Sequence, residues 1–164
     1  EKLKTMKDSG VNRLSIGVQS FNGAELKTLG RIHNSEDACC AVELARDSGF
    51  KNISLDLIYG IPGQGLRSWE ESLKKAVGLS PAHISTYELT LEEGTELWKA
   101  VKAGALILPE EKEVIEMYKF AIAYLGDCGF VHYEISNFAI PSYLCRHNVN
   151  YWDRGEYYGI GLGA

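Results

Sequence analysis

Strand-like and helix-like segments alternate along residues 1–90 of this chain. Residues 13–19 alternate apolar with small or polar side chains, and this period of two predicts a strand. Residues 35–48 carry apolar side chains at helical spacing, residues 52–59 alternate again, and Ser68 begins a further helical segment. Residues 83–89 predict a third strand. Strands separated by helices are typical of parallel βαβ units, so the sequence predicts an α/β fold.

The faces of the predicted strands refine this fold class. In the first strand one face is apolar and carries Leu14, Ile16 and Val18. The other face is small or polar and carries Ser15, Gly17 and Gln19. Apolar faces can pack on outer helices while the small or polar faces point inward. This favours part of a (β/α) barrel over a fully buried open sheet, whose strands read as continuous apolar runs. We therefore assign residues 1–94 to a partial barrel and residues 95–164 to an α+β extension.

The rhythm changes within the extension. Thr95 is placed to cap a short helix, and Pro109 introduces a longer helix that ends before Gly129. Residues 131–136 alternate and predict a strand. The last thirty residues are rich in Tyr, Asn, Gly and Trp, and they predict loops with a short strand near residues 158–161.

Composition excludes several classes of protein. The 164 residues are 45% hydrophobic and 24% charged with a net charge of −5, which argues against a nucleic-acid-binding footprint. No apolar run reaches the roughly 18 residues of a membrane span. The four cysteines include no CxxC pair and form no disulfide framework, so a reducing, cytoplasmic location is expected.

Two polar residues lie on inward faces of predicted strands, Gln19 at the end of the first and Asp56 within the second. Ligands of parallel β/α folds lie beyond the carboxyl ends of the strands, where a carboxylate and an amide suit a vicinal diol such as ribose. The residues alone leave another interpretation open, in which Asp56 caps a nearby loop and Gln19 only packs.

Two further sites have the same ambiguity. Arg31 follows a short helical segment, where its guanidinium suits a carboxylate ligand or is simply solvated. Residues 145–152 contain three haem-iron ligand types, Cys145, His147 and Tyr151, beside Trp152, which is suited to stacking on a macrocycle. The chemistry of this segment is equally compatible with a packed corner.

Five segments, in this order, resemble one family. They are residues 10–21 (GVNRLSIGVQSF), 29–33 (LGRIH), 52–64 (NISLDLIYGIPGQ), 133–139 (YEISNFA) and 145–152 (CRHNVNYW). They are similar to segments of the radical S-adenosylmethionine (SAM) proteins of the oxygen-independent coproporphyrinogen III oxidase-like family. The last segment resembles the mark of its haem-chaperone (HemW-like) branch.

The resemblance implies a partial barrel that binds SAM beside a [4Fe–4S] cluster. By motif, Gln19 and Asp56 fall on the positions that bind the SAM ribose, and Arg31 falls on the position that contacts the methionine moiety. Thr90 falls where backbone lies near the adenine. His147 becomes a candidate haem contact.

One element of the family pattern is absent. Its cluster is held by a CxxxCxxC motif near the amino terminus, and this chain has no such motif. The resemblance therefore implies an internal fragment, with no metal ligand of its own and with the cluster cysteines and the first strands upstream. The fragment alone is expected neither to hold the cluster nor to cleave SAM.

Three functions remain open at this point. The first is a haem chaperone that binds haem or a porphyrin and passes haem to apo-proteins. The second is an oxygen-independent coproporphyrinogen III oxidase, an enzyme of porphyrin biosynthesis; the HNxxYW segment favours the chaperone, because the family's oxidases lack it. The third is an unrelated barrel enzyme that binds a sugar or nucleotide through Asp56, which explains the rhythm but not the five segments.

Overall fold

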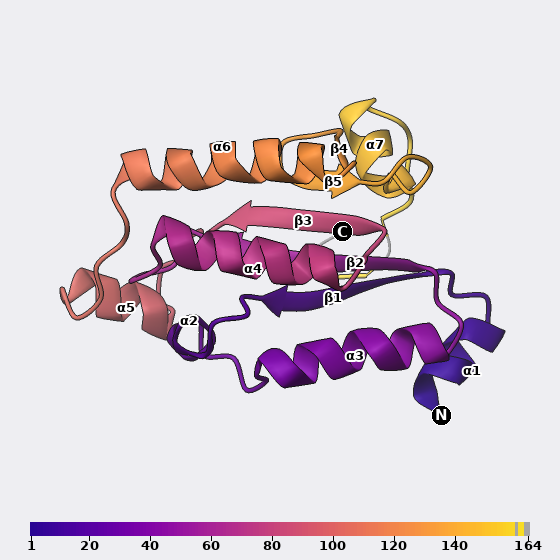
Figure 1. Ribbon diagram of the computed structural model, residues 1–164, viewed down its shortest axis with the longest axis horizontal. Coiled ribbons are helices and arrows are strands. Elements are labelled where there is room, and N and C mark those ends of the chain that lie inside the picture. The colour runs from indigo at the N-terminus through magenta and orange to yellow at the C-terminus, as the bar shows by residue number, and fades with distance from the viewer. Residues whose placement is uncertain (160, 163–164) are drawn as a thin grey trace.

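The computed structural model describes residues 1–159, 161 and 162. Its helices and strands follow the expected alternation, as Figure 1 shows. In chain order they are α1 (Lys2–Asp8), β1 (Arg13–Gln19), α2 (Gly23–Thr28), α3 (Ser35–Asp47), β2 (Asn52–Tyr59), α4 (Leu66–Gly78), β3 (His83–Glu88), α5 (Glu96–Lys102), α6 (Glu111–Asp127), β4 (Val131–His132), β5 (Asn137–Ala139) and α7 (Arg146–Trp152).

The strands of the described residues form one five-stranded sheet in the order β1-β2-β3-β5-β4. The first three are parallel, with Gly17 of β1 beside Asp56 of β2 and Asp56 beside Ser85 of β3. β5 pairs antiparallel with β3, and β4 pairs antiparallel with β5. The α/β class is thus confirmed: three parallel strands joined through helices, extended by an antiparallel hairpin.

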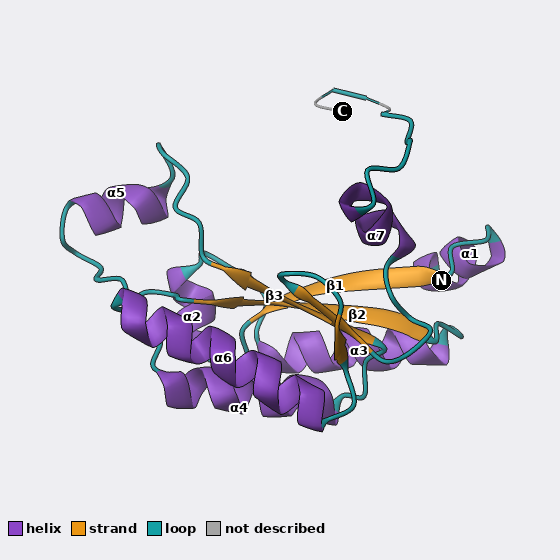
Figure 2. Ribbon diagram, turned by 90° about the horizontal axis from the view of Figure 1, so that it is seen from above, coloured by secondary structure: helices purple, strands orange, loops and turns teal. Residues whose placement is uncertain are grey.

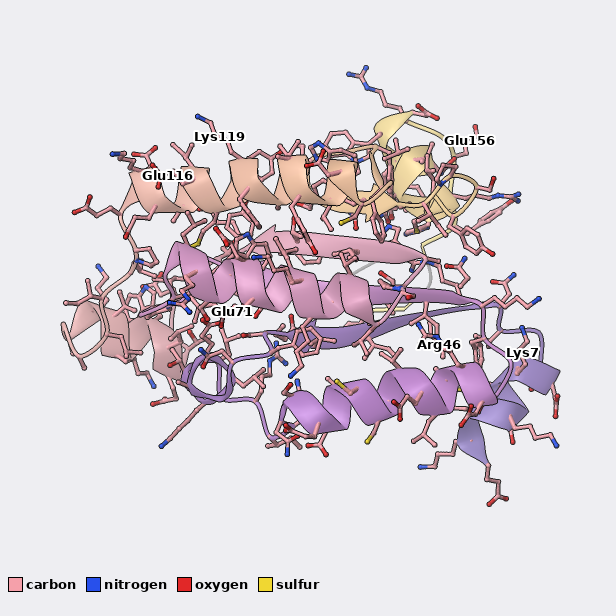
Figure 3. The ribbon with its side chains drawn as sticks, viewed as in Figure 1. Lys7, Arg46, Glu71, Glu116, Lys119 and Glu156 are labelled. Atoms are coloured by element: carbon pink, nitrogen blue, oxygen red, sulfur yellow. The ribbon has the colours of Figure 1, made fainter. Side chains whose placement is uncertain are left out.

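Three helices cover one face of this sheet. α3, α4 and α6 lie against it, while α7 lies over the opposite face (Figure 2). The apolar side chains of the strands, such as Leu55 and Leu57 of β2, point to the helices. They form the core with buried residues of α4 (Trp69 and Leu73) and α6 (Met117). Glu116 and Lys119 project from α6 away from the sheet, as expected of an amphipathic helix (Figure 3). The other face, called here the inner face, carries the small and polar residues of the strands.

Two N-caps expected from the sequence are wrong, namely Ser35 for the helix over residues 35–48 and Ser68 for the helix that follows. Asn34, not Ser35, caps α3, because the Asn34 side chain accepts from the Asp37 N–H at 2.9 Å. α4 begins at Leu66 after Gly65, two residues before Ser68. Ser68 does not act as a cap, since its hydroxyl donates to a buried carboxylate of α2, Glu25, at 2.5 Å.

The carboxyl-terminal part also differs from the prediction. The strand expected over residues 131–136 is limited to β4 at Val131–His132. The chain then turns toward β5, and a hydrogen bond from the Tyr133 N–H to the Asn137 carbonyl (3.3 Å) closes the turn. Residues 146–152, predicted as loop, form α7. The short strand predicted near residues 158–161 is absent at residues 158, 159 and 161, and Ile160 lies outside the described residues.

In the part of the chain that the structure describes, no helix combines the length and the apolar character needed to cross a membrane.

Candidate functional site

The carboxyl ends of the parallel strands meet at one edge of the sheet. In Figure 1 the arrowheads of β1 and β3 point toward α2 and α5, while α7 lies at the other end of the strands. Gln19 is the last residue of β1, Arg31 follows α2, and Thr90 follows β3. Asp56 lies on the inner face of β2. We call this group of four residues the carboxyl-end site.

Gln19 has an unusual backbone. Its φ is +66°, a left-handed conformation that non-glycine residues rarely adopt, and the register of β1 against β2 shifts between Gly17 and Gln19. The side chain turns back over Gly17, because a Cβ built on Gly17 would lie 2.6 Å from the Gln19 Nε2. Since Gly17 pairs with Asp56, the carboxamide is brought to the part of the inner face that carries this carboxylate.

Hydroxyl groups orient Asp56. The Ser15 Oγ donates to both carboxylate oxygens, at 2.9 and 3.0 Å, and the Ser54 Oγ approaches Oδ1 at 3.4 Å. Asp56 makes no ion pair among the described residues, and its side chain is only partly buried. The carboxylate therefore keeps the capacity to accept hydrogen bonds from a polar ligand on this face.

Arg31 and Thr90 are placed less tightly. The Arg31 side chain is exposed, and its backbone N–H donates to the Leu26 carbonyl at 2.9 Å. Thr90 is exposed and directly follows Leu89, whose N–H donates to the carbonyl of Tyr59 at the end of β2 (2.9 Å). The fold thus brings Gln19 near Asp56 and places Arg31 and Thr90 at the same edge of the sheet.

A buried carboxylate supports this edge. Glu25 of α2 is only 4% exposed and accepts from Ser20 at 2.5 Å, Gln64 at 2.9 Å and Ser68 at 2.5 Å. Ser20 directly follows Gln19, and Gln64 belongs to the loop between β2 and α4. The network ties together the ends of β1 and β2, and it was not recognised from the sequence.

A second set of hydrogen bonds crosses the inner face from Asp56 to α7. The Ser54 hydroxyl meets the Nδ1 of buried His83 at 2.8 Å, and the His83 Nε2 meets the Tyr133 hydroxyl at 2.7 Å. Tyr133 accepts from the Cys145 N–H (3.4 Å) and lies 3.5 Å from the Asn148 amide nitrogen. Burial raises the pKa of Tyr133 and keeps its hydroxyl protonated.

Both ring nitrogens of His83 are hydrogen-bonded, Nδ1 to the Ser54 hydroxyl and Nε2 to the Tyr133 hydroxyl. A hydroxyl can donate or accept, so either neutral tautomer of His83 satisfies both bonds. Burial, with a smaller contribution from the positive charge of Arg13, lowers the pKa of His83 to about 4.

His147 lies at the opposite end of the strands from Gln19. It is exposed in the first turn of α7, with its ring edge-on to Tyr151 at 4.8 Å between centroids. It borders a cavity of about 500 Å³ between α7 and the start of β1 and β2, where Arg13 and Asn52 also line the wall. We call this the amino-end cavity.

Trp152 does not fill the core, because its side chain is 56% exposed and its Nε1 donates to the Glu134 carboxylate at 3.1 Å. Its stacking on a macrocycle stays a prediction. Arg13 was not recognised as a site residue. Its position at the start of the inner-face alternation of β1 was the available signal.

The residues present fit the implied cofactors unequally. The oriented Asp56 carboxylate and the Gln19 carboxamide suit a ribose diol, and Gly17 leaves room that a Cβ would fill. No group of three or more His, Cys, Asp or Glu suitable for a metal occurs among the described residues, and all four cysteines are free. The inner face thus fits a ribose, whereas the described residues provide no ligand set for an iron–sulfur cluster.

Comparison with known proteins identifies the class. Residues 1–76 match the family model described as the Radical SAM superfamily. The structure is similar to the coproporphyrinogen III oxidase HemN of Escherichia coli, a radical SAM enzyme, with a TM-score of 0.78 and 27% identity. That likeness covers 93% of this chain and 34% of HemN. Residues 1–76 thus form part of a radical SAM domain, in a chain whose fold is similar to that of HemN.

Its sequence is also similar, over the whole chain, to proteins named heme chaperone HemW. It is 42% identical to the heme chaperone HemW of Lactococcus lactis and 43% identical to that of Bacillus subtilis, over all 164 residues in each case. The chain spans 43% of the length of both relatives. It is therefore a homologue of the HemW proteins that corresponds to less than half of their length.

Proposed function

We propose that the protein of which this chain is part is a cytoplasmic haem chaperone that binds haem, SAM and a [4Fe–4S] cluster and passes haem to apo-proteins. The identity to proteins named heme chaperone HemW over the whole chain supports this function. The cluster would be held by residues outside this chain, since the described residues offer no ligand set.

In this proposal the carboxyl-end site binds SAM. Asp56 and Gln19 hold the ribose hydroxyls, Arg31 pairs with the methionine carboxylate, and backbone near Thr90 lies beside the adenine. SAM held beside a reduced cluster would supply radical chemistry through its reductive cleavage. The residues of this chain bind and orient the nucleoside, and the Glu25 network keeps Gln19 in its left-handed conformation.

The observation that favours a chaperone over an oxidase is the separation of the two sites. His147 borders the amino-end cavity, whereas Gln19 ends β1, a strand of 7 residues. At about 3.3 Å per residue, the two ends of β1 lie roughly 20 Å apart. An oxidase must bring a porphyrin side chain to the radical at the carboxyl-end site, and a macrocycle held at His147 is not placed for that reaction.

The alternative is an oxygen-independent coproporphyrinogen III oxidase, favoured by the structural likeness to HemN. In that function SAM-dependent chemistry would oxidatively decarboxylate the substrate's propionate side chains. The carboxyl-end site suits both functions equally, so its residues do not discriminate between them.

A haem titration tests the proposal. The protein at the full length of its relatives, with its cluster reconstituted anaerobically, is titrated with haem and followed by absorbance. We expect saturable one-to-one binding that His147→Ala weakens and that the control His132→Ala, on exposed β4, leaves unchanged. Binding no tighter than to an unrelated barrel protein would refute the chaperone; binding that is indifferent to His147→Ala would refute the assignment of this residue.

A further inference from the structure

The amino-end cavity has the charge of an anion site. It is about 500 Å³ in volume, within the range of small-molecule pockets, and is lined by Asn12, Arg13, Asn52, Cys145, Arg146 and His147 together with two further residues. Two of these side chains are permanently cationic, and none of the lining residues is acidic. The cavity joins the start of the barrel strands to the start of α7.

The two arginines have no counter-ion. Neither Arg13 nor Arg146 takes part in any of the ion pairs found among the described residues. The Nε of Arg13 is buried without a hydrogen-bond partner, and so is the Oδ1 of Asn52, the residue paired with Arg13 across β1 and β2. A buried donor on a cation is costly to leave unpaired, so this guanidinium is suited to an anionic ligand.

The positive charge of Arg13 acts on His83. After burial, this charge is the second cause of the lowered pKa of His83. Asp56, the carboxylate of the inner face, is bonded to Ser15 and Ser54 rather than to Arg13. The fold thus holds Arg13 beside α7 without using its charge internally.

We propose that the amino-end cavity is a carboxylate-binding site in which Arg13 and Arg146 bind the two propionate groups of haem. A guanidinium binds a carboxylate through two parallel hydrogen bonds, and haem carries its two propionates on one edge of the macrocycle. The same cavity carries His147, a residue type that binds haem iron. This inference rests on the proposed haem-binding function and adds the groups that recognise the ligand's acidic edge.

The test compares haem with haem dimethyl ester, in which both propionates are blocked. Each is titrated into the full-length protein and into the variants Arg13→Gln, Arg146→Gln and the double variant. Arg67→Gln serves as the control, because Arg67 is exposed on α4, away from the cavity. Circular dichroism checks folding, and Arg146 is itself exposed, so its variant carries the test if Arg13→Gln does not fold.

We expect each cavity substitution to weaken haem binding roughly 10- to 100-fold, as for the loss of a charge-assisted hydrogen bond. The ester should bind the unsubstituted protein as weakly as haem binds the double variant, and no substitution should affect it further. This inference would be overturned if the ester bound as tightly as haem and the substitutions did not weaken haem binding. The proposed haem-binding function would then still stand. No haem binding to the unsubstituted protein would overturn the proposed function itself.

Discussion

His83 is expected to make the stability of this domain depend on pH in a way that one substitution removes. The side chain is fully buried at the start of β3, between the hydroxyls of Ser54 (2.8 Å) and Tyr133 (2.7 Å). Burial and the nearby charge of Arg13 lower its pKa from 6.5 to about 4. The folded protein therefore holds His83 neutral at pH values where the unfolded chain protonates it.

The sign and size follow from these two pKa values. Above pH 6.5 both states are neutral, and His83 gives the free energy of unfolding no pH dependence. Between pH 6.5 and about 4 only the unfolded state gains a proton, so stability falls as the pH falls. At about 1.36 kcal/mol per pKa unit, the loss is about 2 kcal/mol at pH 5 and about 3 kcal/mol at pH 4.

Urea unfolding at pH 7, 6 and 5 measures this loss. His83→Gln keeps a group that can bond to both hydroxyls but cannot titrate, so its free energy of unfolding should lack the 2 kcal/mol decrease. His132→Gln, at an exposed position on β4, should retain it. Carboxylates titrate in the same way in all of these variants, so their contribution to the pH dependence cancels when the variants are compared. Equal pH dependence in the unsubstituted protein and in His83→Gln would refute this explanation.

Three further predictions concern the carboxyl-end site. Gly17→Ala should displace the Gln19 side chain, because the new Cβ would lie 2.6 Å from Nε2; isothermal titration should show weaker SAM binding, with the free energy of unfolding changed by less than about 1 kcal/mol. Asp56→Asn should weaken SAM binding roughly 10- to 100-fold, whereas the helix-end control Asp47→Asn should not. Glu25→Ala, which leaves the donors of Ser20, Gln64 and Ser68 without their acceptor, should lower the free energy of unfolding by about 3 kcal/mol in denaturant titrations. A Gly17→Ala protein with unaltered SAM affinity, or a Glu25→Ala protein as stable as the parent, would contradict these assignments.

The parallel strands were predictable because their pattern is local. The alternation of Leu14, Ile16 and Val18 with small residues reflects one helix-covered face and one inner face, and both are set by neighbouring residues along the chain. The left-handed Gln19 was not predictable, since its conformation depends on pairing with β2 and on the space above Gly17.

The helix α7 was missed for a physical reason. Asn148 and Asn150 are poor helix formers, and no apolar stripe marks the segment. Contacts from distant parts of the chain hold it instead: the Cys145 N–H bonds to Tyr133, and the Trp152 indole bonds to Glu134. The amino-end cavity depends on this packing of α7 over the sheet, so the inner-face position of Arg13 on β1 did not by itself predict that Arg13 lines a cavity.

The most direct test of haem carriage against porphyrin oxidation is an anaerobic turnover assay. The full-length protein, with its cluster reconstituted and one equivalent of haem shown to bind, is incubated with SAM, a reductant and coproporphyrinogen III. Decarboxylated product is then quantified by chromatography, with the Asp56→Asn variant as the baseline. The account predicts no product above that baseline. Repeated turnover that Asp56→Asn abolishes would contradict it and establish the oxidase function.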